Sequence, residues 1–127
     1  GRAELERQRA EQVKGFLTGL LRDASPHHAG DVGSLTAIDL MRQASDRLQA
    51  AGIAQPEVRV ELATLIGEGL VTLGDYDRAE PVLEQAAREG RRELGDAHVL
   101  TLHARLNQAH MLRLRGRVAE QHRELLA

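Results

Sequence analysis

Hydrophobic residues along most of the chain recur every three or four positions, which predicts helices rather than strands. Near the N-terminus they form one apolar face of a helix predicted over 3–22, made by Val13, Phe16, Leu17, Leu20 and Leu21. The stretch before Val13 is charged or polar apart from Leu5, so it should be solvated or form a stalk that joins this domain to a preceding segment. A loop rich in Pro and Gly is predicted over 23–33.

The same periodicity divides the rest of the chain into five further predicted helices, over 35–51, 56–73, 76–94, 97–115 and 117–126. Ser34 can cap the first of them, and Pro56 suits the first turn of the second. Gly74 ends that helix, and Asp75 can cap the next. Gly116 is expected to end the helix over 97–115. The predicted fold class is therefore all-α with about six helices.

A shift of 42 residues brings similar residues into register, and this predicts stacked helix–turn–helix units, a helical solenoid. The matched pairs are Ala37 with Ala79, Met41 with Leu83 and then Leu125, Ala44 with Ala86, Val60 with Leu102, Gly67 with Ala109, Leu70 with Leu112, and Gly74 with Gly116. The predicted organisation is an N-terminal helix and loop (1–33), a half repeat (34–53), a repeat (55–95) and a partial repeat (97–127).

One unit resembles a complete tetratricopeptide repeat: Ala63-x-x-Ile66-Gly67-x-x-Leu70, then Gly74-Asp75-Tyr76-Asp77-Arg78-Ala79, then Leu83 and Ala86. Gly67 and Ala79 are small where two helices would cross, and Tyr76 adds a large ring at the turn. The partial repeat keeps Leu112, Gly116 and Leu125 but has Val118 in place of the turn aromatic. The period of 42, with Pro81 and the stretch Leu94-Gly95-Asp96-Ala97-His98, is similar to the kinesin-light-chain type of repeat.

A second resemblance covers the first third of the chain. Phe16-Leu17-x-x-Leu20-Leu21, Ser25-Pro26, Ala29-Gly30 and Leu35-Thr36-Ala37 resemble the segment before the repeats in bacterial membrane serine/threonine kinases. The resemblance implies an extracytoplasmic location if the chain is attached to such a kinase, and a cytoplasmic one otherwise. The chain has no Gly-rich phosphate loop, His-Arg-Asp or Asp-Phe-Gly motif, so it is not expected to be an enzyme.

Composition narrows the function classes. The net charge is −2, and the chain has one Phe, one Tyr and neither Trp nor Cys. Direct nucleic-acid binding is not expected, because a basic excess and aromatic stacking residues are both missing. Thiolate metal sites and disulfides are excluded, and no apolar stretch reaches membrane-spanning length.

Candidate catalytic and metal-binding groups have simpler explanations. The six histidines are His27, His28, His98, His103, His110 and His122. His103 and His110 lie two helical turns apart, roughly 10 Å, which is too far for two ligands of one ion. Glu61 and Glu68 are also seven residues apart, and are expected to be solvated charges rather than an acid–base pair. No catalytic, cofactor-binding or metal-binding residue is therefore predicted.

If the repeats stack, the first helix of each pair lines a concave groove. The groove candidates are Glu61, Thr64, Leu65, Glu68 and Val71, with His103, Leu106, Asn107, His110 and Arg113. The resemblance implies that the Asn107 amide bonds the backbone of a bound peptide, since it both donates and accepts. The alternative is that this face packs against a further repeat or against the first helix of the chain.

The function expected from these observations is a non-catalytic protein- or peptide-binding module, the sensory or interaction region of a larger bacterial signalling protein such as a serine/threonine kinase. One alternative is a structural unit that forms homo-oligomers by burying its exposed apolar faces against a second copy. Another is the helical regulatory domain of a transcription regulator. The sequence does not identify the partner.

Overall fold

The computed structural model describes residues 1–23 and 36–126, and in this part the chain is all-α. Five α-helices pack together, and a π-helical turn, η1, follows the fourth. Their bounds are α1 (Arg2–Asp23), α3 (Ala37–Ala50), α4 (Pro56–Thr72), α5 (Tyr76–Glu89), η1 (Gly90–Leu94) and α6 (Val99–Leu126). The loop was predicted over 23–33, but Asp23 is the last residue of α1, and the rest of that loop lies outside the described residues, as do Ser34, His27 and His28. No helix of the described part is long and apolar enough to cross a membrane.

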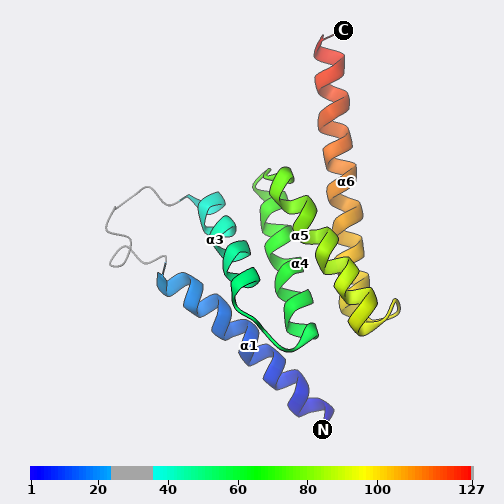
Figure 1. Cartoon of the computed structure of the whole chain (residues 1–127). Helices are drawn as coiled ribbons and strands as arrows, with labels where there is room; N and C mark the ends of the chain where they lie inside the picture. Colours follow the sequence, from blue (N-terminus) through cyan, green and yellow to red (C-terminus); the bar gives the residue numbers. More distant parts are fainter. Residues whose placement is uncertain (24–35, 127) are drawn as a thin grey trace.

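The helix α4 lies at the centre of the fold and packs against α1, α3, α5 and α6 (Figure 1). It is apolar on several sides, and its buried residues are Val58, Val60, Leu62, Ala63, Thr64, Ile66, Gly67 and Leu70. The core continues into α5 through Ala79, Val82, Leu83, Ala86 and Ala87. Burial of each large aliphatic side chain stabilises the fold by roughly 2 kcal/mol, which fixes α4 and α5 as one hairpin.

The α4–α5 turn confirms the boundary predicted at Gly74 and Asp75. Gly74 has φ +84°, and its N–H donates to the Val71 carbonyl at 3.0 Å, while the Asp75 N–H donates to the Leu70 carbonyl at 2.8 Å. This pair of bonds is a Schellman motif, which satisfies the last carbonyls of the helix. The Asp75 carboxylate then accepts from the Arg78 N–H at 3.4 Å and caps α5.

The N-cap of α3 is Thr36, a residue that the sequence analysis did not predict as a cap. The Thr36 hydroxyl accepts from the Asp39 N–H at 3.1 Å, and the Thr36 N–H donates to the Asp39 carboxylate at 3.2 Å. This reciprocal capping box satisfies two backbone donors at once. It also lowers the pKa of Asp39 below its ordinary value of 3.8, chiefly through the bond from the Thr36 backbone.

The single helix predicted over 76–94 is also corrected, since the α-helix ends at Glu89 and the wider turn η1 follows. A Cβ atom on Gly90 would lie 3.2 Å from the Thr101 Cα atom, so glycine lets the two backbones approach closely here. The Gly95 N–H donates to the Gly90 carbonyl at 2.9 Å and closes the turn, and Gly95 has φ +93°. This geometry returns the chain to α6.

The predicted break at Gly116 is wrong, because α6 is continuous from Val99 to Leu126 and replaces two predicted helices. Glycine inside a helix costs only about 1 kcal/mol relative to alanine, so it ends a helix only where capping or packing favours a turn. Gly74 has Asp75 as a following cap, whereas Arg117 follows Gly116. The C-terminal part of α6 consequently projects beyond the other helices (Figure 1).

The residues assigned to structural repeat positions divide into two groups. Gly67, Ala79, Leu83 and Ala86 are buried, and Tyr76 packs against the core as a half-buried side chain. In the partial repeat, Leu112 is 48% exposed, Leu125 is 86% exposed, and Gly116 is exposed. The five packed helices establish the all-α class, and the solenoid stays a prediction.

Candidate functional site

The helices α4 and α6 share a surface that contains two of the predicted groove residues. Glu68 of α4 and His103 of α6 form a pair in which Oε1 and Nε2 are 3.0 Å apart. Their side chains are 36% and 50% exposed, so both are accessible from solvent. This contact shows that the side of α4 that carries Glu68 and the side of α6 that carries His103 lie next to each other and face solvent.

Helical spacing extends this surface along both helices, since residues three or four apart lie on one side. We call the resulting surface the α4–α6 face, and it comprises Glu61, Leu65 and Glu68 of α4 with Val99, His103, Leu106 and His110 of α6. Leu65 is 39% exposed and Leu106 is 69% exposed. The α4–α6 face therefore presents apolar side chains around a central polar pair.

The helix α1 borders the α4–α6 face without covering it. Arg9 and Glu61 form an ion pair with Nε and Oε2 3.1 Å apart. Next to it lies a hollow of about 370 Å³ between α1 and the starts of α4 and α6, with Leu5, Glu57 and Val99 among its lining residues. One part of the predicted groove is thus closed by the first helix, while Leu65 and Leu106 stay exposed.

Thr64 and Val71 are groove candidates that the structure places elsewhere. Thr64 is 1% exposed, and its hydroxyl donates to the Val60 carbonyl at 2.8 Å. Val71 packs as a partly buried side chain against the core. Both lie on sides of α4 that pack against other helices. The sequence pattern did not predict this, because it indicated a more exposed helix than α4 is. Thr64 is therefore not accessible to a peptide on the α4–α6 face.

Asn107 lies beside the α4–α6 face and is half-buried. Its Nδ2 donates to the His103 carbonyl of the same helix at 3.0 Å. The amide donor is therefore engaged within α6. A role in bonding a peptide backbone stays a prediction, and it requires this bond to be exchanged. Arg113 is exposed further along α6.

Two residues have structural roles that the sequence analysis did not predict. Arg59 of α4 donates from Nη1 to the carbonyls of Ile53 and Ala54, at 2.5 and 2.9 Å, and forms an ion pair through Nε with Glu89 of α5. His98 accepts the Leu100 N–H at Nδ1, at 3.1 Å, and so helps to cap α6. Neither role follows a spacing rule, because each depends on how the chain folds back.

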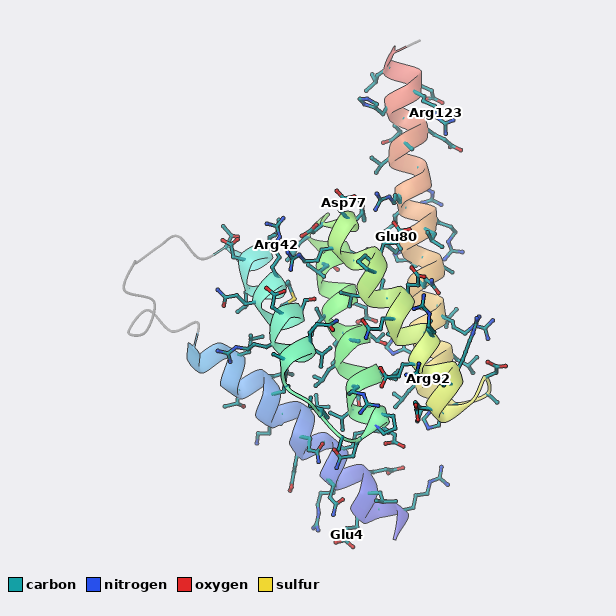
Figure 2. The ribbon with its side chains drawn as sticks, in the orientation of Figure 1. Glu4, Arg42, Asp77, Glu80, Arg92 and Arg123 are labelled. Carbon is teal, nitrogen blue, oxygen red and sulfur yellow. The ribbon has the colours of Figure 1, made fainter. Side chains whose placement is uncertain are left out.

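A larger hollow, about 610 Å³, lies between α3 and α5. Several of its polar side chains form contacts that join the α3 side to the α5 side. Arg42 and Asp75 are 2.9 Å apart, Arg78 and Asp46 are 3.2 Å apart, and Gln49 donates to Gln85 at 3.2 Å. Figure 2 shows Arg42 and Asp77 at the same end of α3 and α5. This hollow is bridged by the protein itself, so the α4–α6 face is the stronger candidate for a partner.

No three His, Cys, Asp or Glu side chains among residues 1–23 and 36–126 come together in a group that could hold an ion. His103 is paired with Glu68, and His98 accepts a backbone N–H.

Searches against protein-family models, curated proteins and solved structures find no significant match to this chain.

Proposed function

We propose that the chain is a non-catalytic module that binds a protein or peptide on the α4–α6 face. The observation that carries the proposal is the exposed group Leu65, Val99 and Leu106 around the Glu68–His103 pair. Protein interfaces commonly combine apolar anchors with a polar rim. The face is built on two helices with a packed core, so the backbones that carry its side chains are positioned before a partner arrives.

We further propose that the helices belong to the tetratricopeptide type. The α4–α5 hairpin supports this, since Gly67 lies against Leu83 and the turn at Gly74 is followed by a capped helix. Shifted by 42 positions, Gly74 and Leu83 match the identical residues Gly116 and Leu125, and Gly67 matches another small residue, Ala109. With the resemblance around Phe16, this makes the interaction region of a larger bacterial signalling protein the best-supported setting.

A structural role in self-association is the second candidate, and a separate observation favours it. The projecting end of α6 exposes Val118 by 50% and Leu125 by 86% (Figure 1). Two copies could bury these side chains against one another. Light scattering over a dilution series tests this: a mass that falls with dilution supports self-association, and a constant monomer mass excludes it.

Selection from a displayed random peptide library tests the binding function. Peptides recovered on the wild-type chain should lose at least tenfold in affinity for L65S/L106S, because burial of two leucines contributes several kcal/mol. The matched control is L112S, an exposed leucine of α6 outside the face, and it should retain binding. Circular dichroism must show that both variants fold. Recovery of no peptides, or equal losses in both variants, would reject the proposal.

A further inference from the structure

Exposed residues form a continuous line along the side of α6 that faces away from α5. The residues are Val99, Leu102, Leu106, His110, Arg113 and Arg117, and we call them the outer stripe. Their spacing of three or four residues keeps them on one side of the helix over about 27 Å. Val99, Leu102 and Leu106 are 69%, 44% and 69% exposed. The outer stripe is therefore apolar in its first half and basic in its second.

The basic half of the outer stripe is electrostatically unsatisfied. Arg113 and Arg117 are exposed and have no acidic side chain within ion-pair distance among the described residues. Arg115, between them, is instead held by Asp77 at 2.7 Å and Glu80 at 3.0 Å, in the region labelled in Figure 2. The sequence from Val99 to Ala119 contains no Asp or Glu. Glu120 and Glu124 continue the same side of α6 beyond Arg117, but neither forms an ion pair with Arg113 or Arg117. These two arginines are thus free to pair with a partner.

We propose that the ligand of this chain is an acidic amphipathic peptide that lies along the outer stripe. Its apolar side chains cover Val99, Leu102 and Leu106, and its carboxylates pair with Arg113 and Arg117. Such charge complementarity fixes the register of a partner and speeds its association. The inference rests on the proposed function, because the outer stripe shares Val99, Leu106 and His110 with the α4–α6 face.

Other anionic partners fit the outer stripe less well. A helix that binds a membrane surface carries cations along the flanks of its whole apolar face, whereas here cations and leucines follow one another along the axis. Nucleic-acid binding draws on many phosphate contacts, and the stripe offers two unpaired arginines. A peptide with separate apolar and acidic parts matches the order of side chains on α6.

Fluorescence polarisation with two labelled helix-forming peptides tests this chemistry. Both carry leucines on one face of the first half, and the second half carries glutamates in one peptide and lysines in the other. The wild-type chain should bind the glutamate peptide, and R113E/R117E should weaken it on the order of tenfold or more. The lysine peptide should bind R113E/R117E more tightly than it binds the wild-type chain. Added salt should weaken the binding of the glutamate peptide to the wild-type chain.

R105E is the matched control, because Arg105 is also exposed on α6, has no acidic partner among the described residues, and lies off the outer stripe. It should change the affinity less than twofold. An effect as large as that of R113E/R117E would overturn the inference, since it would mean unspecific attraction. The inference would also be overturned if the wild-type chain bound the lysine peptide as tightly as the glutamate peptide. Binding to phosphatidylserine vesicles that depends in the same way on Arg113 and Arg117 would overturn it too.

The outcomes separate this inference from the function on which it rests. Library peptides that need Leu65 and Leu106 but tolerate R113E/R117E would leave the α4–α6 face as a binding surface and reject the acidic ligand. Failure to recover any library peptide would reject both.

Discussion

Gly67 of α4 lies directly against Leu83 of α5. A Cβ atom on Gly67 would be 2.3 Å from Leu83 Cδ2 and 2.5 Å from Leu83 Cγ. Leu83 is fully buried, so it has little room to rotate away. The two helices therefore owe their close approach to the missing side chain at position 67.

We predict that Gly67→Ala destabilises the protein by about 1–3 kcal/mol, and that Gly67→Leu does so by more. The alanine must displace Leu83 or separate the helices, and this cost exceeds the roughly 1 kcal/mol that alanine gains in helix propensity. Urea unfolding followed by circular dichroism measures the change. A midpoint equal to or above that of the wild type would contradict the packing described for α4 and α5.

Gly116→Ala provides the control, because Gly116 does not pack against another helix. Apart from its chain neighbours and the backbone of its own helix, no atom lies within 4 Å of the Cβ position at Gly116, which is inside the continuous helix α6. Alanine there should raise helicity and stabilise α6 by about 0.5–1 kcal/mol. A loss of stability would show instead that Gly116 forms a turn.

The comparison of Gly74 and Gly116 explains why part of the fold could be predicted from the sequence and part could not. Both glycines follow an apolar helical pattern, and both were expected to end a helix. Only Gly74 is followed by a capping aspartate and by a helix that buries Leu83 and Ala86. Helix boundaries depend on such tertiary packing, which the local pattern does not contain.

The candidate site, like the fold, could be predicted only in part from the sequence. Helical spacing placed Glu68 and His103 on outward-facing sides, and their pairing depends on how α6 packs against α4. Thr64 looked equally outward by spacing, but α4 is surrounded on more sides than a typical surface helix. Arg9 was not predicted at all, because its contact with Glu61 joins segments far apart in the sequence.

We predict that Arg59→Ala destabilises the protein by roughly 2 kcal/mol. Arg59 holds the carbonyls of Ile53 and Ala54, and its loss leaves Glu89, with a side chain only 12% exposed, without its ion-pair partner. Thermal unfolding of Arg88→Ala gives the matched comparison. Arg88 pairs with Glu84 on the surface of α5 at 2.7 Å, and its removal should cost about 0.5 kcal/mol or less. Equal losses of stability in the two variants would show that the Arg59 contacts contribute no more than a surface ion pair.

We predict that Thr101→Val leaves stability unchanged or raises it by up to about 1 kcal/mol. Thr101 is fully buried, and its hydroxyl has no hydrogen-bond partner among the described residues. Valine has nearly the same shape and removes an unpaired polar group. Denaturant unfolding measures the difference. A clear loss of stability would mean that the hydroxyl has a partner, such as a buried water near Gly90.

The capping box of α3 should make stability depend on pH through Asp39. The bond from the Thr36 backbone lowers the pKa of Asp39 below its ordinary value of 3.8 in the folded state. The folded protein therefore favours the charged carboxylate, and the stabilisation is fully present above the ordinary value. It is lost as the pH falls through the lowered pKa.

We predict that wild-type protein is more stable than Asp39→Asn at pH 6 to 7, and that the difference shrinks steadily below about pH 4. Urea unfolding of both proteins from pH 7 to pH 3 measures this. A difference that stays constant over that range would show that the Asp39 charge does not stabilise α3.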